Sequence, residues 1–153
     1  MTVSVGAVVS SKKIILVEGH VEVDGTITLI KDETMNLETG DRPAALRQMH
    51  KRVKDRLSEG VDKVAVKASS GGRFAAKTGV LHAAELRGVF LSAIPNQVEI
   101  LETHAKSVSK GKSQKIGDYL NDDDYFSKNF TGVELRKGSR EAALLMFEVE
   151  GKQ

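Results

Sequence analysis

The chain has 153 residues, of which 40% are hydrophobic and 29% are charged, and this composition is that of an ordinary globular domain. It contains no cysteine, which excludes disulfides, thiolate metal sites and thiol catalysis. No apolar run approaches the ~20 residues of a membrane span, the first residues lack a signal-peptide pattern, and a net charge of +2 selects no class of partner. We therefore expect one cytoplasmic domain over residues 1–153, without membrane contact.

The first thirty residues predict three consecutive β-strands. Residues 3–9 alternate and are rich in valine, and residues 14–17 form a second apolar run. Asp24 and Gly25 form a dipeptide that is typical of tight hairpins, and residues 26–30 follow it as a third strand. Because the connections are short, these strands are expected to form an antiparallel meander.

The remainder of the chain alternates between helical and strand patterns. The expected elements are a helix between Asp41 and Gly60, a strand at 61–66, a helix at 75–93, a strand at 98–101, and helices at 112–120 and 138–148. Right-handed crossovers would add the later strands in parallel beside the first. The sequence therefore predicts an α/β domain with a mixed five-stranded sheet, in the order 3-2-1-4-5, and helices on both faces.

Three segments, in order along the chain, carry a resemblance to a known family. They are residues 6–11 (GAVVSS), residues 64–74 with the helix that follows, and residues 105–115. In this order they resemble the Holliday-junction resolvases of the RuvC type. Residues 61–110 also resemble a family of small bacterial proteins of unknown function in the same superfamily. The resemblance covers nearly the whole chain and implies a ribonuclease H-like fold.

The resemblance also implies a metal-dependent nuclease site, and the sequence departs from it. Active members use two Mg²⁺ ions to activate water and to stabilise the leaving oxygen, and Mg²⁺ requires oxygen ligands such as carboxylates. The positions of the family's acids fall at Val8, at Lys67, and near Gly138 and Glu141, where only Glu141 is acidic. We therefore predict that the standard two-metal site is absent, and with it any metal or other cofactor.

Glycines and cations after the fourth expected strand form the main candidate binding site. Gly71 and Gly72 precede a helix, a position at which backbone N–H groups can bind an anion, and Lys67, Arg73 and Lys77 add positive charge. The alternative is a connection that only needs the conformational freedom of glycine. A second basic segment contributes Lys106, Lys110, Lys112 and Lys115.

Two further charged stretches have simpler interpretations. The helix between Asp41 and Gly60 carries six cations opposite its apolar stripe: Arg42, Arg47, Lys51, Arg52, Lys54 and Arg56. Such a helix face either follows phosphates or is a solvated outer surface, and the sequence favours the second interpretation. The acids between Asp118 and Asp124 lack the spacing of a calcium loop, so a solvated turn is expected there.

Three functions remain open. The first is a non-catalytic module that binds nucleic acid or another phosphate-bearing ligand through its basic edge. The second is a homo-oligomeric scaffold for protein interaction, because a fold alone does not assign chemistry. The third is a Mg²⁺-dependent nuclease with a displaced acid set, Glu18, Glu102 and Glu141. The first two rank almost equally and the third lower, so the sequence leans against an enzyme but leaves the question open.

Overall fold

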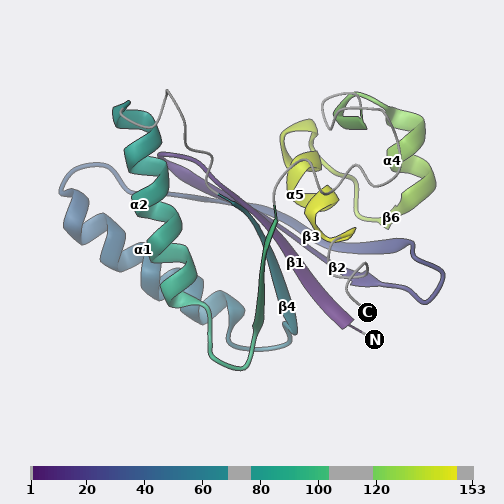
Figure 1. Ribbon diagram of the computed structural model, residues 1–153, viewed down its shortest axis with the longest axis horizontal. Helices are drawn as coiled ribbons and strands as arrows, with labels where there is room; N and C mark the ends of the chain where they lie inside the picture. Colours follow the sequence, from purple (N-terminus) through teal and green to yellow (C-terminus); the bar gives the residue numbers. More distant parts are fainter. Residues whose placement is uncertain (1, 69–76, 104–118, 148–153) are drawn as a thin grey trace.

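The computed structural model describes residues 2–68, 77–103 and 119–147 (Figure 1). Its elements in chain order are β1 (Thr2–Val9), β2 (Lys13–Val21), β3 (Ile27–Asn36), α1 (Arg42–Leu57), β4 (Lys63–Lys67), α2 (Thr78–Ala93), β5 (Glu99–Thr103), α4 (Asp123–Asn129), β6 (Phe130–Gly132), the 3-10 helix η2 (Lys137–Ser139) and α5 (Arg140–Leu145). Among the helices of the described residues, none is long and apolar enough to cross a membrane.

All the strands join one mixed sheet in the order β5-β4-β1-β2-β3-β6. β1, β2 and β3 pair antiparallel, whereas β4, β5 and β6 each run parallel to their neighbours. The predicted fold class and the order 3-2-1-4-5 are confirmed. The predicted number of strands is wrong, because a short sixth strand pairs with β3. Three residues carry no readable alternation, and Gly132, at φ 94°, turns the chain directly afterwards.

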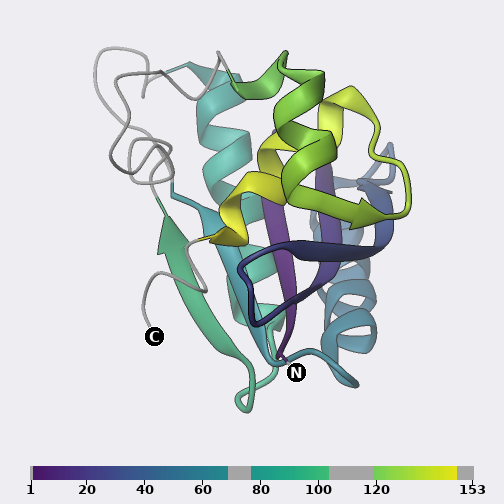
Figure 2. The same cartoon turned by 90° about the vertical axis from the view of Figure 1, so that its right-hand side faces the viewer.

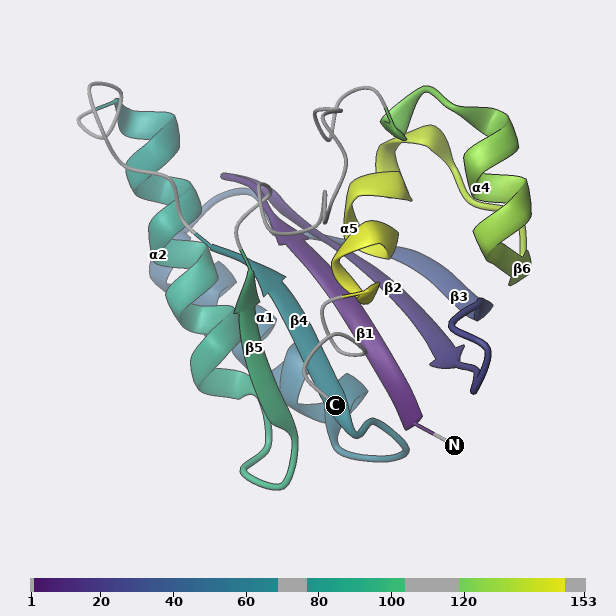
Figure 3. The ribbon, with the colours of Figure 1, turned by 45° about the vertical axis from the view of Figure 1, so that its right-hand side comes forward.

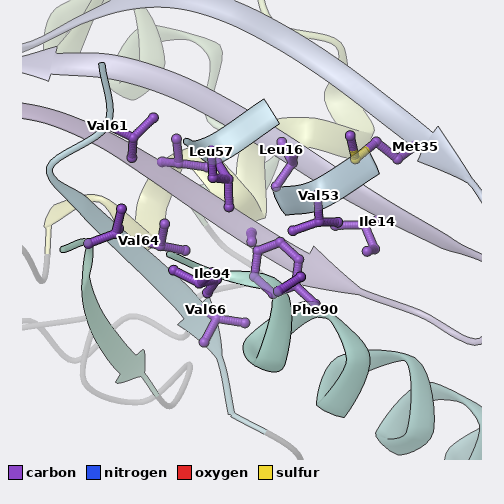
Figure 4. Packing of buried hydrophobic residues seen from close by; sticks show 14 of the residues in the cluster. Ile14, Leu16, Met35, Val53, Leu57, Val61, Val64, Val66, Phe90 and Ile94 are labelled. Carbon is purple, nitrogen blue, oxygen red and sulfur yellow. The ribbon is translucent and has the colours of Figure 1, made fainter. Parts of the chain in front are cut away.

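Helices cover the two faces of the sheet with separate cores. On one face, α1 and α2 pack over Val5 and Ala7 of β1, and Phe90 of α2 is fully buried among them (Figure 4). On the other face, α4 and α5 cover β2 and β3 (Figure 2, green and yellow). Alternate residues of β1 therefore face opposite helical layers, as expected for a strand buried on both sides.

The approach of α5 to β1 depends on Gly6. A Cβ atom at this position would overlap the carbonyl oxygen of Ala142, and Met146 lies next to it. The helix backbone thus rests directly on the strand backbone, which only glycine permits. This contact places the first turn of α5 over the carboxyl ends of β1 and β4 (Figure 3).

Two helical predictions need correction. The stretch interpreted as a solvated turn contains the start of α4, where the Asp122 side chain accepts a hydrogen bond from the backbone N–H of Tyr125 at 3.0 Å. Asp122 is therefore a helix cap, and Asp123 and Asp124 lie in the first turn, where they interact favourably with the helix dipole. The predicted final helix ends at Leu145 rather than at 148. Residues 112–118 of another predicted helix lie outside the described residues.

Polar residues in the second half of β3 are held by partners that are distant in sequence, which is why this strand extends beyond the predicted residue 30. Asp32 is buried, with 7% of its side chain exposed. Its carboxylate accepts hydrogen bonds from Arg136 at 2.7 Å and from the Ser139 hydroxyl at 2.6 Å. Burial raises the pKa of Asp32, but these hydrogen bonds outweigh it and leave the pKa lowered. The carboxylate thereby fastens η2 to the sheet.

Asp32→Asn is expected to lower the free energy of unfolding by about 2 kcal/mol at neutral pH. Because the pKa of Asp32 is lowered on folding, its contribution is present above the ordinary value of about 3.9 and is lost as the pH falls below it. Urea unfolding should be measured above and below this pH. The difference in unfolding free energy between wild type and variant should become smaller in acid. An equal gap at every pH would contradict the assignment.

Candidate functional site

The candidate site lies where the carboxyl ends of β1 and β4 meet. The order of the sheet places β2 and β4 on opposite sides of β1, so the connections after β1 and β4 diverge at this point. Ligands of α/β proteins bind at such a divergence, outside the carboxyl ends of the strands. Ala7 pairs with Val66, and therefore Val8 and Lys67 come next along the two strands.

Val8 occupies the position that the resemblance assigns to the first acid. It lies on the α5 face of β1, partly buried against Ala65, Leu101 and Leu145. These neighbours come from β4, β5 and α5, and all are apolar. Val8 thus contributes to packing where a nuclease of this fold would need a carboxylate.

Lys67 and Glu141 occupy two other positions assigned to acids, and the structure brings them together. The Nζ atom of Lys67 lies 2.5 Å from Oε1 of Glu141, which joins the end of β4 to the first turn of α5. Their side chains are 38% and 26% exposed, so the ion pair is open to solvent at one side. A pair of this kind contributes little to stability, on the order of 0–1 kcal/mol.

Arg87 of α2 fastens β4 and β5 from the opposite face. Its Nε donates a hydrogen bond to the backbone carbonyl of Lys67 at 2.9 Å, and its terminal nitrogen lies 3.4 Å from a carboxylate oxygen of Glu102. These contacts hold the last residue of β4 from the α2 face of the sheet, while Glu141 binds its side chain on the α5 face. Lys67 is therefore held through its backbone on one face of the sheet and through its side chain on the other.

The three acids of the proposed displaced set do not come together. Glu18 binds Arg56 of α1, and Glu102 binds Arg87 of α2, both on one face of the sheet. Glu141 binds Lys67 on the other face. Within residues 2–68, 77–103 and 119–147, no three His, Asp or Glu side chains are placed to hold a metal ion.

This group of side chains does not fit the two Mg²⁺ ions that the fold family implies. Val8 offers no ligand atom, and the ammonium of Lys67 repels a cation while neutralising the carboxylate of Glu141. Among the described residues, the side chains at this edge are therefore not arranged to hold a metal ion. Instead of a site for a cation, this edge presents a partly exposed ammonium group that an anion can approach.

Other cations lie at the same edge. Lys12, in the turn that follows β1, and Lys13, the first residue of β2, are both exposed. They are absent from the predicted binding residues, although a basic pair shortly after a strand could have been noticed in the sequence. Lys77, a predicted binding residue, directly precedes α2 and is exposed. The other predicted binding residues, Gly71, Gly72, Arg73, Lys106, Lys110, Lys112 and Lys115, lie outside the described residues.

Comparisons with known proteins extend the fold assignment. No protein-family model matches the chain, and no curated protein sequence matches it. Two Thermus thermophilus RuvC structures, one in complex with a Holliday junction substrate, match 99% of this chain at 14% identity; the match covers 96% and 97% of those chains, with TM-scores of 0.68 and 0.69. A yeast mitochondrial Holliday junction resolvase matches 99% of this chain and 80% of its own at 14% identity, with a TM-score of 0.66. The chain therefore has a RuvC-like ribonuclease H fold, as the sequence resemblance predicted.

Proposed function

We propose that this domain binds nucleic acid at the carboxyl edge of β1 and β4 and does not cleave it by the two-metal mechanism. The observation that carries the proposal is the Lys67–Glu141 ion pair beside Val8, at the positions that a nuclease would fill with acids. One neighbour of the same fold was solved with a Holliday junction substrate, which supports nucleic acid as the class of ligand.

A phosphate would compete with Glu141 for Lys67. The pair is partly exposed and therefore weak, so exchanging its carboxylate for a phosphate oxygen costs little. Lys12 and Lys13 supply further positive charge at this edge without an ion-paired carboxylate among the described residues. Binding of this kind releases counterions and needs no metal.

The first test is a panel of fluorescent four-way junction, duplex and single-stranded probes, titrated with the protein at two salt concentrations in EDTA. We expect binding without metal and a steep loss of affinity at the higher salt. The same probes are then incubated with Mg²⁺ or Mn²⁺ and should remain intact. Cleavage that Glu141→Gln abolishes would overturn the non-catalytic half of the proposal, and no binding at low salt would overturn the rest.

Two substitutions at this pair should change the affinity in opposite directions. Glu141→Gln frees the Lys67 charge and should tighten binding roughly fivefold, whereas Lys67→Gln should weaken it by a similar factor. The salt slope should steepen by up to about one unit in the first variant and become shallower by as much in the second. Both effects are measured by fluorescence anisotropy across a salt series.

The matched controls come from the other end of the same strand. Lys63 of β4 lies 3.5 Å from Glu99 of β5, so Lys63→Gln and Glu99→Gln change the same charges away from the carboxyl edge. They should leave the salt slope nearly unchanged. Equal effects at both ends of β4 would show that net charge alone governs binding and would contradict a site at Lys67.

The predicted homo-oligomer is a separate proposal. It is consistent with the nucleic-acid proposal, because a symmetric assembly can hold more than one strand. Light scattering over a range of concentrations tests it, and a mass of one chain throughout would contradict it.

A further inference from the structure

The cations of α1 divide into two groups. Three of them are held against the protein. Arg42 binds Glu85 of α2 at 2.5 Å, Arg52 donates a hydrogen bond to the backbone carbonyl of Asn36 at 2.9 Å, and Arg56 binds two carboxylates of β2 and β3. These residues join α1 to its neighbours, and their charges are used within the fold.

The other three cations, Arg47, Lys51 and Lys54, are exposed on the outer side of the helix, and we call them the α1 ridge. No carboxylate of residues 2–68, 77–103 or 119–147 lies within ion-pair distance of them. The spacings of four and three residues place them on one side of the helix over about 10 Å of its length.

Arg47 and Lys51 of the α1 ridge gain no stabilisation from an ion pair within the described part of the fold. Like charges at these spacings destabilise a helix by roughly 0.2–0.5 kcal/mol per pair. Arg47 also lies in the N-terminal half of α1, whose first turn contains no acidic residue, although acids are favoured there. Lys54 lies in the last turn of α1, where the helix dipole favours a cation, but Arg47 and Lys51 gain nothing from the dipole. Positive charge that is repeated on one face beyond what the helix needs indicates a ligand outside the fold.

The neighbours of the ridge favour nucleic acid over a protein or membrane partner. The exposed residues beside it are small or polar, such as Ala44 and Gln48, with one acid, Asp55, at its end. A protein interface needs large apolar or aromatic anchors, and a membrane-surface helix needs apolar side chains to insert. A length of about 10 Å spans roughly three phosphates of one strand of a duplex.

We propose that the α1 ridge is a second surface that binds the phosphate backbone of nucleic acid. It lies on the face of the sheet opposite α5, so the domain would hold one segment at the carboxyl edge and another along α1. This inference deepens the proposed nucleic-acid function, but it rests on different residues and can fail separately.

The test compares a triple variant, R47Q/K51Q/K54Q, with the wild type on a fluorescent duplex of about 30 base pairs. The salt slope should become shallower by up to about 2.7 units, because each phosphate contact contributes about 0.9. The effect of Lys67→Gln should add to this loss, since the two surfaces are well separated. A control triple variant, K31Q/K128Q/K137Q, removes the same charge elsewhere and should leave the slope nearly unchanged.

A bridging assay separates the two surfaces. The protein is added to an immobilised duplex, and capture of a second, fluorescent duplex is measured; the ridge variant should bind the first duplex and lose the capture. Capture lost in the Lys67→Gln variant alone would overturn the ridge and leave the carboxyl edge. If only the ridge variant loses capture of the second duplex, and Lys67→Gln binds duplex as tightly as the wild type, the ridge is supported and the proposed site at the carboxyl edge is contradicted. If the ridge variant loses binding only to phosphatidylserine vesicles, a membrane surface replaces nucleic acid and the inference is wrong.

Discussion

Gly6→Ala is expected to lower the free energy of unfolding by about 3 kcal/mol or more, because the added methyl group would meet backbone atoms rather than a side chain. The new Cβ atom would overlap the carbonyl oxygen of Ala142, so either β1 or α5 must move. Neither moves freely, because both Ala142 and the flanking Val5 and Ala7 are fully buried. A backbone cannot change rotamer to relieve such an overlap.

Chemical denaturation of Gly6→Ala measures this loss, and Gly88→Ala is the matched control. Gly88 lies in the interior of α2, where an added Cβ would meet nothing within 4 Å. Alanine there should stabilise the protein by about 0.5–1 kcal/mol, because helical glycine is costly. If Gly6→Ala is as stable as the wild type, α5 does not rest on β1 as described. If it is too unstable to purify, the highest temperature at which each variant still folds distinguishes it from Gly88→Ala.

Arg56→Met is expected to destabilise the fold by about 3 kcal/mol. The guanidinium lies between Glu33 and Glu18, with both terminal nitrogens 3.1 Å from Oε1 of Glu18. Only 15–21% of these three side chains is exposed. Burial opposes the charge of Arg56, but hydrogen bonds and attraction to the two carboxylates outweigh it and raise the pKa of the guanidinium. Methionine would preserve the volume but leave Glu18 facing Glu33 with Lys31, 3.5 Å from Glu33, as the one remaining cation among the described residues.

The control for this variant is Arg42→Met on the same helix. Its partner, Glu85, is 50% exposed, so the loss should stay within about 1 kcal/mol. Thermal and urea unfolding at neutral and mildly acidic pH compare the two. Equal deficits for Arg56→Met and Arg42→Met would show that the buried triad contributes no more than an exposed pair.

The order of the elements could be predicted because long helices and strands each show a characteristic spacing of apolar residues. The valines of β1, the hairpin dipeptide before β3 and the Asp41 cap of α1 each indicate local structure on their own. The same cap accepts a hydrogen bond from the backbone N–H of Ala44, as its position predicts. Strand order then follows from short connections and right-handed crossovers, which leave few arrangements to choose from.

The short elements could not be predicted from the sequence, because they are stabilised by residues that are distant in the chain. β6 has three residues and forms only because β3 provides a parallel partner. The polar end of β3 is stable because Arg136 and Arg56 bind Asp32 and Glu33 from opposite faces. Without these partners, the second half of β3 is only a run of polar residues, and the sequence therefore predicted that the strand ends at residue 30.

The candidate site shows the same division. The sequence by itself determined that the residues at these two positions are Val8 and Lys67, and the resemblance to the resolvases predicts carboxylates there. Only the tertiary structure decided that Glu141 pairs with Lys67 while Glu18 and Glu102 bind arginines on the other face. Distances between residues far apart in sequence depend on how helices pack against the sheet, and here that packing depends on the missing side chain of Gly6.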